Sequence, residues 1–150
     1  LMRGQRLRRK SVLVPPPGIA VRNSSDGLVI NDPFVAHAAR LIRENALTGL
    51  NVDQLCRKLN ASRSTLDRRM KVALKRTPKE EILRVRFREV ERLLRETDLT
   101  IDTIAAQTGF AHSHYLQAAF KETHGTTPGE WRRAQIFAAL SPNGAKAIRR

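Results

Sequence analysis

The chain is 150 residues long and 41% hydrophobic, enough to bury the core of one domain or of two small ones. Its formal net charge of +14 at pH 7 favours a polyanionic partner, and its single cysteine excludes an internal disulfide framework. No apolar run is long enough to cross a membrane, and none follows the basic N-terminus as in a signal peptide. We therefore expect a cytoplasmic protein with no membrane partner.

Residues 1–31 form the first predicted region. Residues 1–12 hold five basic side chains and no acid, typical of a solvated arm, with phosphate binding as the alternative. Residues 13–31 contain three consecutive prolines and an Asn-Ser-Ser-Asp-Gly run, typical of extended chain and turns. We expect a basic arm and a Pro-rich linker, which could also be the remnant of a missing effector domain.

The helical region is predicted to begin at Asp32, which precedes a proline at the first helical position. After this helix, residues 51–72 have the pattern of a helix-turn-helix. Asn51 can cap its first helix, Asn60 stands at the reversal where a positive φ is needed, and Ser62 can cap its second helix. The second helix of this motif is shaped to enter a DNA major groove.

A long linker helix is predicted over residues 78–97. Thr77, Pro78 and Glu80 supply a cap, an N1 proline and a capping-box glutamate. One face is apolar, and the others alternate arginine and glutamate, which is typical of a solvated, salt-bridged surface. About twenty residues at 1.5 Å rise make a rod of about 30 Å.

The helix-turn-helix pattern returns about 50 residues later, over residues 100–124. The apolar phase, the turn residue (now Gly109) and the Thr-Pro-x-Glu cap all recur, which indicates an internal repeat. We expect a short final helix, Pro128–Arg133, with Trp131 packed inward. A basic tail over residues 134–150 would follow, frayed at the end of the chain.

The predicted fold is therefore all-α, with about seven helices and two helix-turn-helix units joined by the long helix. Successive major grooves on one face of B-DNA are about 34 Å apart, so one chain could place a helix in each. The deep major groove of RNA would not admit these helices. Double-stranded DNA is the expected partner.

The motifs resemble the DNA-binding region of the AraC/XylS family of bacterial transcription regulators, over residues 32–133. The residues that carry the resemblance are Leu99, Ile101, Ile104, Ala105, Gly109, Phe110, Tyr115, Leu116, Phe120, Lys121, Gly125, Thr127, Pro128, Trp131 and Arg132. In the first unit, Asn60 and Ala61 replace the family's turn glycine and the aromatic residue after it. We expect the fold to hold, with looser packing at that turn.

Two stretches, VPPPGIAVRNSSD and EEILRVRFREVERLLRETDLT, are most similar to xylose-operon regulators. This resemblance implies a sugar-binding domain ahead of the DNA-binding region, and no such domain fits in the first 34 residues. A sugar effector would then act only through a domain absent from this chain, which is either a fragment or a regulator without its sensor. The family also implies recruitment of RNA polymerase and a location at the bacterial nucleoid.

The resemblance assigns DNA contacts to the exposed face of each second helix. The candidates are Arg63, Ser64, Asp67, Arg68, Lys71, Ser113, His114, Gln117 and Lys121. Arg68 is the strongest, because arginine suits the O6/N7 edge of guanine, although a phosphate contact is the alternative. Asp67 could accept from cytosine or pair with an arginine. Arg69 and Lys71 are expected to contact phosphate or solvent.

We predict no catalytic site, cofactor or metal. His112 and His114 are two positions apart on a predicted helix and should point in different directions, without zinc-ligand spacing. Cys56 aligns with Ala105 and is interpreted as a small core residue. The predicted function is a sequence-specific DNA-binding transcription regulator, with a sugar operon such as xylose as its target. The alternative is a non-specific or architectural nucleic-acid-binding protein.

Overall fold

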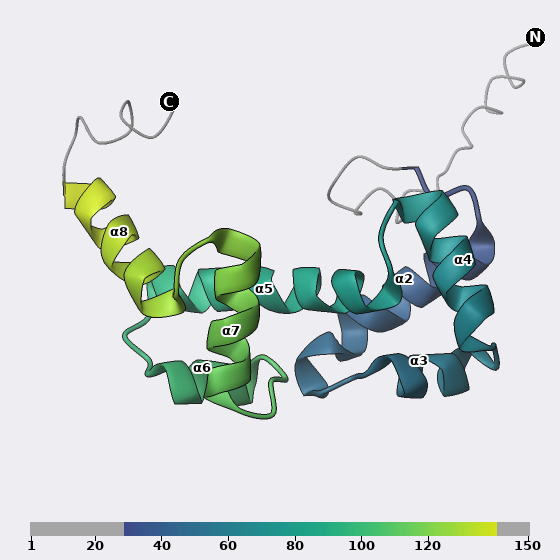
Figure 1. Ribbon diagram of the computed structural model, residues 1–150, viewed down its shortest axis with the longest axis horizontal. Helices are drawn as coiled ribbons and strands as arrows, with labels where there is room; N and C mark the ends of the chain where they lie inside the picture. The colour runs from purple at the N-terminus through teal and green to yellow at the C-terminus, as the bar shows by residue number, and fades with distance from the viewer. Residues whose placement is uncertain (1–28, 141–150) are drawn as a thin grey trace, which may run out of the picture.

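The computed structural model describes residues 29–140, within which all regular structure is helical (Figure 1). The elements are α2 (Pro33–Asn45), the 3₁₀ helix η2 (Ala46–Thr48), α3 (Val52–Leu59), α4 (Arg63–Leu74), α5 (Pro78–Glu96), α6 (Ile101–Gln107), α7 (Ser113–His124) and α8 (Pro128–Leu140). Seven α-helices confirm the predicted class. The predicted arm, most of the linker and the last ten residues lie outside this range. No described helix is long and apolar enough to span a membrane.

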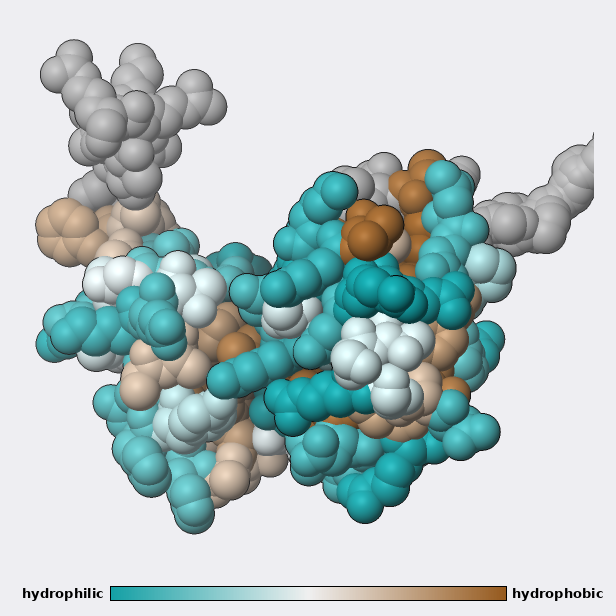
Figure 2. Space-filling view, turned by 45° about the vertical axis from the view of Figure 1, so that its right-hand side comes forward, coloured by the Kyte–Doolittle hydropathy of each residue, from teal (hydrophilic) through white to brown (hydrophobic). Residues whose placement is uncertain are grey.

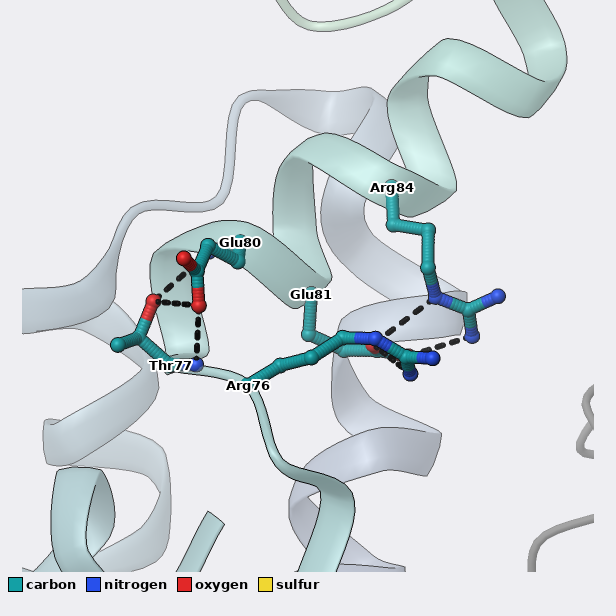
Figure 3. A network of polar contacts seen from close by, with 5 residues as sticks. All are labelled: Arg76, Thr77, Glu80, Glu81 and Arg84. Carbon is teal, nitrogen blue, oxygen red and sulfur yellow. Dashed lines mark hydrogen bonds and ion pairs between the residues drawn. The ribbon is translucent and has the colours of Figure 1, made fainter. Parts of the chain in front are cut away.

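Side-chain caps set the predicted helix starts at Asp32, Asn51, Ser62 and Thr77. The Asn51 side chain accepts from the Gln54 backbone N–H, and the Gln54 side chain accepts from that of Asn51. The same reciprocal box opens α5, where the N–H and hydroxyl of Thr77 both donate to Glu80 (Figure 3). Each cap stabilises its helix by about 1 kcal/mol, which lets helices as short as α3 form between turns.

Two hydrophobic cores share the long helix α5. In Figure 1, α5 runs through the middle, with α2, α3 and α4 at one end and α6, α7 and α8 at the other. The first core is built from Val35, Ala38, Ile42, Ala46, Leu50, Leu55, Leu66, Met70, Leu74 and Ile82. The second is built from Phe87, Val90, Leu93, Leu94, Ile104, Ala105, Phe110, Leu116, Ala119 and Phe120. Since α5 contributes residues to both cores, it is part of each unit as well as the spacer between them.

The last helix is longer than the sequence suggested. It was expected to end at Arg133, but α8 continues to Leu140. Trp131 packs against the second core, as expected. Beyond it, Ile136, Phe137 and Leu140 are exposed, so these large apolar side chains do not anchor the extra turns in the core. They form because residues 134–140 contain good helix formers and no glycine or proline.

One charged cluster on α5 is more buried than expected of a solvated helix surface. Glu81 is only 3% exposed. Arg84 donates to it from Nε and Nη2 at 3.0 and 2.8 Å, and Arg76 donates from Nη1 at 3.3 Å (Figure 3). A buried carboxylate needs such partners, because an unpaired charge away from water is costly. The cluster ties the turn before α5 to the body of that helix.

Candidate nucleic-acid interface

Helix α4 presents a polar face because its apolar residues recur at helical spacing on the other side. Leu66, Met70 and Leu74 are buried in the first core. The opposite face carries the predicted contact residues Arg63, Ser64, Asp67, Arg68 and Lys71. All are exposed except Asp67, which is half-buried. The structure therefore brings the first predicted set together on one surface.

The charged groups of this face differ in their partners. Arg63 lies 3.7 Å from Asp53 of α3, and both side chains are largely exposed. Among residues 29–140, no ion pair joins Asp67 to an arginine. Cys56, behind this face, packs against the first core, and burial raises the pKa of its thiol, with the Asp53 carboxylate adding to the effect. The thiol therefore stays protonated at neutral pH, as a core residue would.

Arg69 was expected to contact phosphate or solvent, but in the structure its guanidinium group pairs with a carboxylate of the protein, although 39% of the side chain remains exposed. Its Nε and Nη2 donate to the two carboxylate oxygens of Asp32 at 2.9 and 2.6 Å, and its guanidinium lies 4.4 Å from the centre of the Phe34 ring. Asp32 also accepts from the N–H groups of Phe34 and Val35. These hydrogen bonds, that of Arg69 foremost, hold the pKa of Asp32 below its ordinary value. Arg69 thus fastens the candidate recognition helix to the start of α2.

Helix α7 presents the second set of predicted residues in the same way. Leu116, Ala119 and Phe120 are buried. The exposed face carries His114, Gln117 and Lys121, and Ser113 is half-buried at the helix start. In the repeat, the position of Arg68 is occupied by Ala118, so this face holds fewer cations than that of α4.

The two histidines at the start of α7 do not point in different directions. Their rings stack, with centroids 5.4 Å apart and planes 9° from parallel. The expectation assumed that both residues are helical, but His112 is the N-cap with extended backbone, at φ −147°. Among the described residues, no group of three or more His, Cys, Asp or Glu side chains could hold a metal ion.

Known proteins are similar to most of the part of the chain that contains α4 and α7. A family model described as a helix-turn-helix domain matches residues 55–134. The xylose operon regulatory protein of Haemophilus influenzae is 32% identical over 132 residues, covering 88% of this chain and 34% of that protein. The structure of a xylose-binding transcription activator has a TM-score of 0.57 and 33% identity, covering 69% of this chain and 27% of that one. The DNA-binding domain of AdpA, in complex with a target DNA, has a TM-score of 0.64 and 27% identity, covering 76% and 100%.

The chain belongs to the AraC family. This family consists of DNA-binding transcription regulators and not of enzymes, which agrees with the prediction of no catalytic activity. The chain spans about a third of the length of the curated xylose operon regulators that it matches. The family match begins inside α3 and runs through the second unit, so α4 and α7 are the second helices of the two helix-turn-helix units in an AraC-type domain.

The departure from the AraC pattern in the first unit leaves the backbone turn intact. Asn60 has φ 51° and ψ 48°, so it adopts the left-handed conformation in place of glycine. The Ala61 N–H donates to Cys56 O at 3.1 Å, just as the Phe110 N–H donates to Ala105 O at 3.0 Å. Ala61 is only half-buried, whereas Phe110 is 4% exposed. The predicted looser packing is confirmed for the side chain, not for the backbone.

A groove of about 450 Å³ lies between the two units of this AraC-type domain. Arg63 and Lys79 line it from the first unit, and Ala111 and Tyr115 line it from the second. Lys79 was not among the predicted residues. It is exposed in the first turn of α5. The exposed cations Arg63 and Lys79 and the Tyr115 ring therefore line the space between the two units.

Proposed function

We propose that this AraC-family chain is a sequence-specific DNA-binding transcription regulator, or the DNA-binding part of one, that places α4 and α7 in adjacent major grooves. The observation that carries the proposal is that α4 and α7 present equivalent exposed faces and that one continuous helix, α5, joins their two units. The 19 residues of α5 span about 28 Å at 1.5 Å each. Successive major grooves on one face of B-DNA are about 34–36 Å apart. The DNA complex of the AdpA domain supports this reading of the shared fold.

The two recognition helices would contribute unequally. The α4 face carries Arg63, Arg68 and Lys71, so it supplies most of the positive charge. Arg68 would read a guanine, and Asp67 would accept from a neighbouring cytosine. The α7 face offers Ser113, His114 and Gln117, which can hydrogen-bond to bases or phosphates with little net charge, and Lys121 would contact phosphate. We infer that α4 carries more of the affinity and of the base readout, and that α7 contributes position more than affinity.

The target proposed for the regulator is a sugar-utilisation operon such as that of xylose. Support comes from the names of relatives, which include xylose operon regulatory proteins of Haemophilus influenzae and Escherichia coli. A sugar would act through a domain outside this chain. By analogy with the family, bound regulator would recruit RNA polymerase at the nucleoid. Genome-wide mapping of bound sites tests the target, and binding with no site near sugar-utilisation genes would reject it.

Selection from a random duplex pool, followed by binding measurements across salt, tests the DNA-binding proposal. The selected duplex should bind at least about 10³-fold more tightly than its shuffled sequence at physiological salt. Both affinities should fall as salt rises, because phosphate contacts release counterions. Equal affinities for the two duplexes at every salt concentration would instead identify a non-specific binder, the alternative that the net charge of +14 favours.

A further inference from the structure

Arg86 is buried at the boundary between the two units. Its side chain comes from the middle of α5, and the residue is only 8% exposed. Its Nε donates to the carbonyl oxygen of Ala46 and its Nη2 to that of Leu50, both at 2.9 Å. These carbonyls belong to the segment between α2 and α3, in the first unit. An arginine that satisfies two carbonyls with two arms of its fork is fixed in direction as well as position.

The same arginine faces the second unit. Its guanidinium carbon lies 5.3 Å from the centre of the Phe110 ring, in the turn between α6 and α7. Burial lowers the pKa of the Arg86 guanidinium, with Tyr115 opposing the effect, yet arginine remains charged at neutral pH. Arg86 therefore contacts carbonyls that precede the first helix-turn-helix and an aromatic residue from the turn of the second.

Gly109 closes the boundary from the other side. It has φ +78°, and a Cβ placed on it would lie 2.6 Å from Ala46 O and 3.0 Å from both Gly49 N and Leu47 O. Real Cβ atoms essentially never lie as close as 2.6 Å to a backbone atom of this kind. The turn of the second unit is thus in direct backbone contact with the 3₁₀ segment of the first.

We propose that Arg86 and Gly109 form an interlock that holds α4 and α7 at one relative orientation, which makes Arg86 a positioning residue for two-groove recognition. The inference rests on the proposed function. Sharing α5 sets how far apart the two units lie along the helix. The interlock adds a second point of attachment, so the units cannot rotate independently when α5 bends or twists. A domain held in this way accepts one spacing between half-sites and rejects others.

Half-site spacing provides the DNA test. Arg86→Met puts an unbranched apolar side chain in place of the arginine and so removes both hydrogen-bond donors. Arg92→Met is the matched control. Arg92 also lies on α5, but among residues 29–140 it bonds only to Glu89 and Glu96 of the same helix, and its replacement removes the same charge. The probes are the selected duplex and the same duplex with two base pairs inserted between its half-sites.

In the wild type and in Arg92→Met, the insertion should weaken binding by about 100-fold, because it displaces one half-site by about 7 Å and turns it by about 70°. In Arg86→Met the penalty should fall below about 10-fold. If Arg86→Met weakens binding to both duplexes by one common factor, the arginine is only structural and the proposal is overturned. Arg86→Lys, which keeps the charge but can reach fewer carbonyls, should give an intermediate penalty and replaces Arg86→Met if that variant does not fold.

A measurement without DNA separates this inference from the proposed function. Exposed Lys58 and Gln107 are replaced by cysteine in a Cys56→Ala background, and spin labels report the distance distribution between the units. The distribution should be narrow in the wild-type background and in Arg92→Met, and broader in Arg86→Met. An unchanged distribution would overturn the interlock. If the distance distribution broadens in Arg86→Met but no preferred duplex can be selected for the protein, the interlock is retained and sequence-specific binding is rejected.

Discussion

The two helix-turn-helix units have the same backbone turn but form it from different residues. The first uses Asn60, an exposed residue in the left-handed conformation, followed by the small Ala61. The second uses Gly109, followed by the buried Phe110. Both turns make the same backbone hydrogen bond. Asparagine can provide the positive φ, so the backbone conformation alone does not require a glycine. The glycine at position 109 is required because backbone atoms of the first unit lie too close to it for a Cβ.

The cores and surfaces of the units differ as well. The buried residues of the first core include no aromatic side chain, and only the partly buried Phe34 packs against them, whereas Phe120 of the second core lies against the rings of Phe87, His124 and Trp131. On the face shown in Figure 2, hydrophilic side chains cover most of the first unit, and the second unit shows more pale and apolar surface. The two units therefore share a backbone, but the first has the more basic surface and the second has the more aromatic core.

The largest expected effect tests the difference between the cores. Phe120 and its repeat equivalent, Met70, are both fully buried. Phe120→Ala should cost about 3–5 kcal/mol of unfolding free energy and Met70→Ala about 2–4 kcal/mol, because the larger ring leaves the larger cavity and loses its ring contacts. Urea unfolding followed by circular dichroism measures both. Equal losses would mean that the aromatic cluster adds nothing to plain burial.

The turns provide the next comparison. Gly109→Ala should destabilise the domain by about 3 kcal/mol, because the added Cβ meets backbone at a position that also has positive φ. Asn60→Ala should cost only about 1 kcal/mol, from the left-handed conformation alone. Asn60→Gly is the control and should be nearly neutral. If the two alanine variants lose the same stability, contact between the units does not explain the glycine.

The recognition faces differ most clearly at Arg68, whose repeat equivalent is Ala118. Arg68→Ala should reduce discrimination at one base pair by about 1–3 kcal/mol and leave preferences elsewhere in the site unchanged. Binding to a panel of duplexes with single base-pair changes measures this. Weakening by one factor on every duplex, with a shallower salt dependence, would make Arg68 a phosphate contact.

The smallest expected effect concerns a pair that joins α4 to α2. Since Arg69 lowers the pKa of Asp32 in the folded state, their pairing stabilises the domain above the unfolded-state pKa of about 4, and this contribution is lost as the pH falls through the lower folded value. Asp32→Asn should therefore be less stable than the wild type at pH 7, with the difference shrinking as the pH falls below the unfolded-state pKa of about 4. Arg69→Met should show the same trend. A difference that stays constant across this range would argue against the charge pair.

Local signals in the sequence predicted the helix starts, the positive φ at Asn60 and the phase of each buried face, because caps and periodicity act over a few residues. Partners distant in the sequence were not predictable. Arg69 pairs with a residue 37 positions away, and Arg86 reaches carbonyls 36 and 40 positions away. Arg86 did leave a signal, since it falls in the apolar phase of α5, four residues from both Ile82 and Val90.

The attachment of α4 to α2 also determines how short a working piece of this chain can be. The matched family model begins at residue 55, inside α3. Val35, Ala38 and Ile42 of α2 are fully buried in the first core, and Asp32 is the partner of Arg69. A piece cut at residue 55 would expose the inner faces of α3 and α4 to water. The shortest piece with both cores closed starts before Asp32, about 23 residues ahead of the region that the helix-turn-helix model matches.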